Sequence, residues 1–260
     1  MGGLWVAVVV LFLYLLPSLL ITAAAADAPP EAQTDLRQQL SALAPGNLSP
    51  HLLGFLFPNL GTSIALILGS LAAGSEYGWG TFKMVLSQRP GRISVFAGKI
   101  LALGALLLLF VVLAFVVGAL SGLVVALSGG VSPGTPPLSE LFGGLGAGTL
   151  ILFLWAAFGF TLSTLFRSTA LSVGLGLIYA FVIEAILSTL SPLSGSLRTL
   201  VRYLPGTNAS ALSTSFGGSA GTQGFEQGFL SPVQSILVVL LYIAAFLIIS
   251  ALVFWRRDVT

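Results

Sequence analysis

The chain has 260 residues, of which 56% are hydrophobic and only 7% are charged, and its mean hydropathy is +1.04. Soluble domains carry about 25% charged residues, so this composition is typical of a membrane protein with no separate soluble domain. The formal net charge of +2 is too small to indicate a nucleic-acid partner. The chain has no cysteine, which excludes disulfides and thiol chemistry.

Six apolar segments are long enough to cross a hydrocarbon core of roughly 30 Å as helices. Lipid offers no hydrogen-bond partner to the backbone, so such continuous runs predict helices, and the alternating strands of a barrel are not seen in the sequence. We therefore expect an all-α membrane protein in which residues 1–260 form one transmembrane domain. The predicted spans are residues 4–25, 52–73, 100–127, 145–166, 170–190 and 233–255.

The first segment ends in small residues, as a cleaved signal peptide does. Its apolar run is longer than the core of a signal peptide, and no Lys or Arg precedes it. We expect it to be retained as a span, and the missing basic flank suggests a longer natural N-terminus.

The segments between the spans differ in character. Residues 31–43 lie between prolines and predict a short helix, while residues 128–140 form a Pro/Gly turn region. Spans four and five are joined only by Arg167, Ser168 and Thr169, which predicts an antiparallel hairpin. The extracellular segment 191–232 contains too few apolar residues to span, but it can dip into the interface or cap a cavity.

Basic residues set the expected orientation, because short cytoplasmic loops are enriched in Lys and Arg. With the N-terminus inside, three basic residues fall outside the cell, namely Arg37, Arg198 and Arg202. The cytoplasmic side then holds the other seven of the ten: Lys83, Arg89, Arg92, Lys99, Arg167, Arg256 and Arg257. We expect a multi-pass protein of the cell inner (plasma) membrane with both termini in the cytoplasm.

Motifs of soluble enzymes are mostly missing. There is no Gly-Lys-Ser/Thr phosphate loop for ATP, and a single histidine, His51, without cysteine cannot build the usual metal clusters. Residues 217–221 match Gly-x-Ser-x-Gly, but Ser219 has no histidine near it in the sequence, which disfavours an intramembrane hydrolase. We expect no catalytic residue and no metal site.

Glu184 is the one acidic residue inside a predicted span. An ionisable group at a helix centre is unfavourable by about 2.5–3.5 kcal/mol on insertion scales and normally faces protein or water. An ion pair with Arg198 or Arg202 is the favoured interpretation, and contact with a substrate is the alternative. A proton relay is disfavoured because no second acid lies in a span.

The basic loop 74–99 contains most of the cytoplasmic charge. Residues 75–86 predict a short helix with Ser75 as its N-cap and an aromatic face that includes Tyr77, Trp79 and Phe82, before a Pro-Gly break. Composition fits two interpretations equally well. One is a helix anchored at the membrane interface, and the other is a docking element for a cytosolic partner.

At this loop the chain resembles the permease subunits of ABC-2-type transporters. Those proteins show an acidic residue, Gly-Thr, a basic residue, a Leu, a Pro with an adjacent Arg, and a Lys entering the next span. Tyr179, Glu184 and residues 204–212 (LPGTNASAL) also resemble the family, whereas the family's usual basic segment before span one is not seen. The matching loop residues are Glu76, Gly80, Thr81, Lys83, Leu86, Pro90, Arg92 and Lys99.

The resemblance implies an ABC-2-type exporter permease fold of six helices. Such a chain forms a homodimer, or a heterodimer with a related permease, and exports a hydrophobic or amphipathic substrate. Two cytosolic ABC ATPase subunits would carry the ATP and Mg, and this chain would bind no cofactor. The loop would be the coupling helix, with coupling residues Glu76, Tyr77, Gly80, Thr81, Lys83, Arg89 and Arg92.

The resemblance also implies a pathway lined by spans two and five at the dimer interface. The glycines that would allow close approach there are Gly54, Gly61, Gly69, Gly74, Gly174 and Gly176. The alternative function is a membrane scaffold or a channel-like protein that needs no ATPase partner.

Overall fold

The computed structural model describes residues 15–24, 29–79, 92–216 and 230–256. Within these ranges every regular element is helical, which confirms the all-α prediction. Of the predicted first span, the structure describes Leu15–Ala24 as a shorter apolar helix, and the rest lies outside the described residues. Within the described residues, five stretches are long and apolar enough to cross a membrane, and they match predicted spans two to six: Pro45–Gly74, Ile93–Gly129, Leu138–Phe166, Thr169–Leu193 and Pro232–Trp255.

The labelled helical elements include short segments as well as the long spans, and two of them have π-helical hydrogen bonding. Helix α2 (Pro30–Ala42) precedes span two and confirms the predicted short helix, and η1 (Pro45–Asn47) begins that span. The others, in chain order, are α3 (Leu48–His51), the π-helix η2 (Leu52–Gly61), α4 (Thr62–Trp79), α6 (Arg92–Gly129), α7 (Leu138–Phe166), α8 (Thr169–Leu177), the π-helix η3 (Ile178–Ile183), α9 (Glu184–Leu190), η4 (Ser191–Leu193), α10 (Gly195–Arg202), α11 (Pro205–Ser215) and α12 (Pro232–Arg256).

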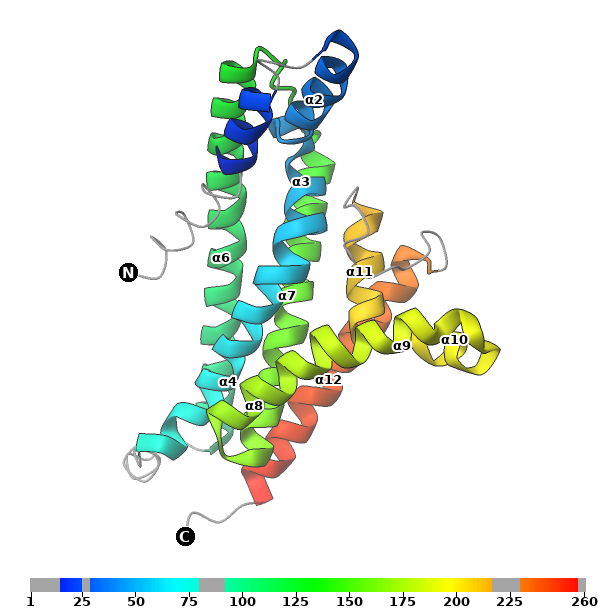
Figure 1. Ribbon diagram of the computed structural model, residues 1–260. Helices are drawn as coiled ribbons and strands as arrows, with labels where there is room; N and C mark the ends of the chain where they lie inside the picture. The colour runs from blue at the N-terminus through cyan, green and yellow to red at the C-terminus, as the bar shows by residue number, and fades with distance from the viewer. Residues whose placement is uncertain (1–14, 25–28, 80–91, 217–229, 257–260) are drawn as a thin grey trace.

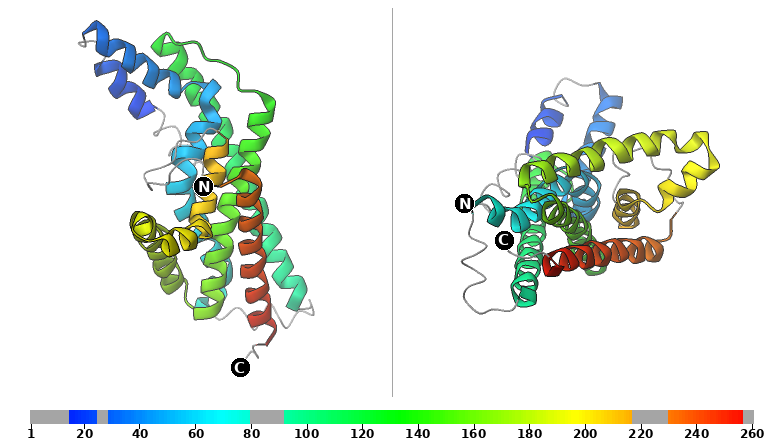
Figure 2. Two further views of the ribbon diagram at one scale, coloured as in Figure 1. Left: turned by 90° about the vertical axis from the view of Figure 1, so that its right-hand side faces the viewer. Right: turned by 90° about the horizontal axis from the view of Figure 1, so that it is seen from below.

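Helices α4 and α7 form the most extensively packed pair, and the two views in Figure 2 place them at the centre of the longer helices. Their backbones approach closely at Gly69, where a Cβ atom would collide with the backbone of Ala156 and lie 2.8 Å from its Cα. Ser70 Oγ donates a hydrogen bond to the carbonyl of Gly159 at 3.3 Å. The apolar core around this pair includes Phe57, Leu66, Leu107, Leu152, Leu154 and Phe160.

The use of the span-two glycines differs from the expectation that they form a dimer interface. Gly61 lies against Leu152, and Gly74 lies against Ser163, so both contact α7 of the same chain. Gly176 on α8 lies against Leu66 of α4. Gly61, Gly74 and Gly176 therefore serve packing within the chain, because small residues permit close approach between any two helices and do not specify which pair. Gly174 has open space around its Cβ position, and the dimer interface itself stays a prediction.

The ends that were predicted to be cytoplasmic lie together at one end of the molecule. The end of α4, the start of α6, the turn from α7 to α8 and the end of α12 are all at the bottom of Figure 1. Helix α2 and the connection from α6 to α7 lie at the opposite end. This grouping agrees with the predicted order for spans two to four and for the cytoplasmic ends of spans five and six, while α10 and the start of α12 lie at mid-height in Figure 1.

The cytoplasmic loop begins later than predicted. Helix α4 continues without interruption through Trp79, so Ser75 lies inside it and is not the N-cap of a new helix. Extending a helix adds one hydrogen bond per residue fixed, whereas a new helix needs a costly first turn. Helix α6 likewise begins at Arg92, before the apolar run predicted from residue 100.

The turn between spans four and five is as short as predicted. Arg167 adopts the left-handed conformation (φ 54°) that commonly ends a helix, and the side chain of Ser168 caps α8 by accepting from the Leu171 N–H at 3.3 Å. Helix α8 packs on both α7 and α4. Beyond it, η3, α9 and α10 lead away from the other long helices in Figure 1, and α11 returns to them.

Candidate functional site

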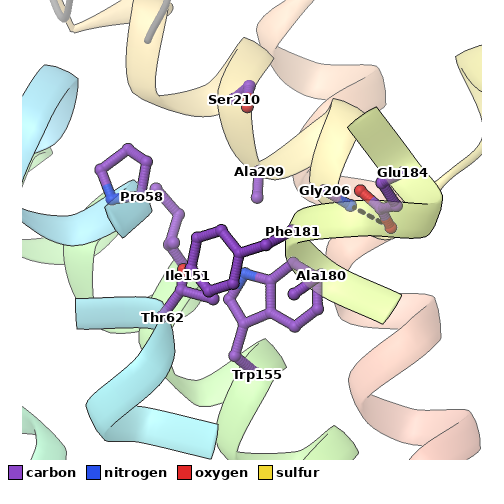
Figure 3. Close-up of a pocket in the computed structure, with 10 residues that line it drawn as sticks. All are labelled: Pro58, Thr62, Ile151, Trp155, Ala180, Phe181, Glu184, Gly206, Ala209 and Ser210. Carbon is purple, nitrogen blue, oxygen red and sulfur yellow. Dashed lines mark hydrogen bonds between the residues drawn. The ribbon is translucent and has the colours of Figure 1, made fainter. Parts of the chain in front are cut away.

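A small cavity lies where span two, α7, span five and α11 meet (Figure 3). Its volume of about 20 Å³ is enough for one water-sized group. The space around it includes space open to the outside. The polar side-chain groups in the lining are one acid, two hydroxyls and the indole N–H of Trp155. The lining consists of Pro58, Thr62, Ile151, Trp155, Ala180, Phe181, Glu184, Gly206, Ala209 and Ser210.

Glu184 is the charged group of this site, and its side chain is 0% exposed. One carboxylate oxygen, Oε1, accepts a hydrogen bond from the backbone N–H of Gly206 at 3.1 Å. Gly206 is the second residue of α11, whose first N–H groups have no partner within the helix, so the carboxylate caps this helix from another element. Within the described part of the chain, the other oxygen, Oε2, has no hydrogen-bond partner.

The approach of α11 to Glu184 depends on the absence of a side chain at Gly206. A Cβ atom there would collide with Oε2 and would lie 2.8 Å from the carboxyl carbon of Glu184. The preceding Pro205 has no N–H and stands in the first turn, where the missing donor is harmless. The Pro-Gly pair therefore starts the helix and at the same time opens its end to the acid.

The π-helical segment η3 brings an aromatic hydroxyl to the same acid. Tyr179 precedes Glu184 by five residues, and i to i+5 is the spacing of hydrogen-bonded residues in a π-helix. The Tyr179 hydroxyl lies close enough to the Glu184 carboxyl to interact with it. The Tyr179 ring packs beside Trp155 and Phe158, with ring centroids 6.5 and 5.2 Å away.

The second π-helix, η2, forms the opposite side of the cavity and contains Pro58. Proline has no N–H, so the carbonyl five residues earlier, that of Leu53, lacks its π-helical donor. Ser213 Oγ from α11 donates to this carbonyl at 2.6 Å, and both groups are buried. Unpaired backbone groups are strongly unfavourable away from water, so this bond attaches α11 to span two as Glu184 attaches it to span five.

The predicted partners of Glu184 do not form its environment. The Glu184 carboxyl is buried, and it interacts with the Gly206 N–H and the Tyr179 hydroxyl. Neither arginine is among its interaction partners. Arg202 is exposed, and its Nη2 donates to Gln234 Oε1 at 3.2 Å. The ion pair with Arg198 or Arg202 was therefore the wrong interpretation, because α11 supplies a backbone donor at shorter range.

The predicted coupling residues are not part of this site. Glu76 and Tyr77 lie in the last turns of α4, and Arg92 begins α6, but their side chains are outside what the structure describes. Gly80, Thr81, Lys83 and Arg89 fall in residues 80–91, outside the described residues, as does Ser219. The coupling assignment therefore stays a prediction.

Two further features of the sequence lie among the described residues. His51 lies half-buried next to η2 with its ring stacked on Phe55, at a centroid distance of 6.3 Å. The glycine-rich start of span four serves close packing, since Gly144 lies against Ser49 and Gly148 against Phe57.

Sequence reasoning missed most of the cavity residues. The described site adds hydroxyls and aromatic side chains that look ordinary in an apolar run, such as Thr62, Trp155 and Phe181. Pro58 was the available signal, because a proline inside a predicted span must leave a carbonyl for another group to satisfy. The partner, Ser213, could not be assigned from spacing, since it lies 160 residues away from Leu53.

In the described part of the chain, five long apolar helices, one of which contains a buried acid, define a multi-pass helical membrane protein. The chain belongs to the family described as protein of unknown function DUF2705, whose model matches residues 40–260. A search of curated proteins found no significant match to the chain.

Proposed function

We propose that the chain is the transmembrane permease subunit of an ATP-binding cassette exporter. A separate cytosolic subunit hydrolyses ATP, and the loop 74–99 transmits its movement to the spans. ATP-driven closure of two ATPase subunits would bring two such loops together and change access to a pathway between the helix bundles. A ligand on one subunit then biases a two-state element on another.

The observation that supports this proposal most directly is the position of the loop. It connects α4, the helix at the centre of the packing, to α6, and α4 extends as an uninterrupted helix toward it through Trp79. A force applied at the loop would act on α4, which is packed along α7 and α8. Rigid helices of this kind transmit a displacement over their full length, whereas a loop joined to peripheral helices would not move the centre.

A direct test is co-purification with an ATPase encoded beside this chain. Both proteins are co-expressed, and the complex is isolated through a tag on the ATPase. We expect the full-length chain to be retained, and a chain in which residues 80–91 are replaced by a Gly/Ser linker of equal length to be lost. Failure of the unmodified chain to bind any such ATPase would favour a scaffold or channel that works without one.

A second test separates docking from coupling. The double variant Glu76→Ala/Thr81→Ala is expected to keep the ATPase bound but to uncouple ATP hydrolysis from transport in reconstituted vesicles. The matched control is Glu140→Ala/Thr135→Ala, which changes the same residue types on exposed positions near the other end of the molecule. Unchanged transport in the first double variant would contradict the coupling role.

A further inference from the structure

The cavity beside Glu184 is lined by a buried carboxylate and by no basic side chain that could neutralise its charge. Glu184 is fully buried, Oε2 lacks a hydrogen-bond partner within the described residues, and the lining contains no Lys, Arg or His. A buried carboxylate normally has a cation or several donors beside it. Here the protein provides one backbone donor and the nearby Tyr179 hydroxyl.

The remaining lining suits a small cation with donors of its own. Thr62 Oγ1 donates a hydrogen bond to the Phe57 carbonyl at 3.2 Å, so its lone pairs remain available to accept hydrogen bonds. Ser210 contributes a second hydroxyl oxygen, and Glu184 contributes Oε2. Three acceptor groups around one cavity match the three N–H donors of a primary ammonium group.

Aromatic side chains on the same cavity favour an organic cation over a metal ion. Trp155 and Phe181 line it, and a cation near the face of an aromatic ring is attracted by the ring quadrupole. Calcium and magnesium ions prefer six or more oxygen ligands, more than these side chains offer. Among the described residues, no group of three His, Cys, Asp or Glu side chains could hold a metal ion.

The size of the cavity narrows the class of cation. A volume of about 20 Å³ admits a group the size of water, which fits –NH₃⁺ and excludes a quaternary ammonium with three methyl groups. The space around the cavity is partly open to the outside, and Ile151 and Ala180 give it apolar walls along which an alkyl chain can lie.

We propose that the cavity bounded by Glu184, Thr62, Ser210, Trp155 and Phe181 is a binding site for the primary ammonium group of an aliphatic or amphipathic amine. The carboxylate and the two hydroxyls accept the three N–H bonds, and the rings face the charge. Only the statement that this amine is a transported substrate rests on the proposed function. Binding itself needs no ATPase.

The test uses the purified full-length chain in a neutral maltoside detergent, with n-butylammonium chloride as the probe. Trp5, Trp79 and Trp255 are replaced by Phe, so that Trp155 is the only fluorescent tryptophan. We expect a saturable change in its emission with butylammonium and none with tetramethylammonium, sodium or potassium chloride. No saturable change with butylammonium, or an equal response to any of the other three cations, would overturn the proposal.

Variants assign the binding to Glu184. Glu184→Gln keeps an acceptor for the Gly206 N–H but removes the charge, and we expect it to weaken butylammonium binding by about tenfold or more. Glu140→Gln, which changes an exposed acid at the start of α7, is the matched control and should bind as the parent does. Equal affinity of the Glu184→Gln variant and the parent protein would contradict the site.

If Glu184→Gln fails to fold, Ser210→Ala provides the second test. It removes one acceptor at a half-buried position and should weaken binding by about threefold to tenfold. An unchanged affinity in Ser210→Ala would contradict the three-acceptor arrangement. Loss of ATPase co-purification with intact amine binding would refute the transport proposal alone, and the reverse result would refute the ammonium site alone.

Discussion

The backbone N–H of Gly206 donates to Glu184 Oε1 at 3.1 Å, although the two residues lie 22 positions apart on different helices. The contact joins the start of α11 to the middle of span five. On its other side, α11 is attached to span two by the hydrogen bond from Ser213 to Leu53. This short helix therefore links the two spans that contain π-helical segments, and it closes one side of the cavity between them.

Gly206→Ala should destabilise the protein, because its Cβ atom would collide with the Glu184 carboxylate. Inserting a methyl group into a packed site is unfavourable by about 1–3 kcal/mol, and here it also displaces the hydrogen bond to the acid. The measurement is SDS-induced unfolding in mixed micelles, followed by far-UV circular dichroism. Gly174→Ala is the control, since nothing lies within 4 Å of its Cβ position in α8, and we expect it to be neutral or stabilising. Equal stability of the two variants would contradict the described approach of α11.

Gly69→Ala should destabilise the central helix pair more than any other single methyl addition proposed for this chain. The new Cβ would meet the backbone of Ala156, which cannot move aside as a flexible side chain can. We expect a loss of about 3 kcal/mol in the same unfolding assay. Gly98→Ala on α6 has open space around it and should change stability by less than about 1 kcal/mol, in the stabilising direction.

Ser213→Ala should leave the Leu53 carbonyl without its donor and reduce stability by about 1–3 kcal/mol. The explanation that Pro58 creates this need can be tested with a double-mutant cycle. Pro58→Ala restores a backbone N–H in η2, so Ser213→Ala should be less destabilising by about 1 kcal/mol in that background. Ser215→Ala, whose hydroxyl bonds within its own helix to Leu212, should have an effect below about 0.5 kcal/mol. Additive effects of Pro58→Ala and Ser213→Ala would show that the serine does not compensate for the proline.

Thr161→Val should weaken the attachment of α12 to α7. The Thr161 hydroxyl shares its proton between the carbonyl of Ala157 in its own helix, at 2.8 Å, and that of Phe246 in α12, at 3.0 Å. It also accepts from Ser250 Oγ at 2.9 Å, so one threonine contacts two positions on α12. Hydrogen bonds between membrane helices contribute about 0.6 kcal/mol on average, and we expect a loss of about 1 kcal/mol. Thr149→Val on the same helix removes a bond to Leu145 in its own helix and should have a smaller effect in the unfolding assay.

The apolar runs were sufficient to predict the helices. Lipid offers no hydrogen-bond partners to the backbone, so a long continuous apolar run must form a helix, and spans two to six were predicted on this basis. The turn at Arg167 was predicted because few residues separate spans four and five. Helix ends were predicted less well, as Ser75 shows. The residues just beyond the apolar run are compatible with helix, and hydropathy does not mark where a helix stops.

Side-chain partners could not be predicted. Glu184 was identified as unusual because a lone acid in a span needs an explanation, but charge alone pointed to Arg198 or Arg202. The tertiary structure instead brings the Gly206 N–H to it, since a glycine at the start of α11 lets the backbone come close enough to donate.

Composition and sequence pattern determined that this chain is a helical membrane protein, because burial in lipid is a property that each segment has by itself. Which helices meet was decided only by the tertiary structure, because close approach depends on the shapes of two surfaces at once. Gly69 packs against the backbone of Ala156, and Ser213 donates to the Leu53 carbonyl that lacks a donor because of Pro58. Gly206 has no side chain, so its N–H can donate to the Glu184 carboxylate. Each of these pairs joins residues far apart in sequence, and in none of them does one residue by itself specify the other.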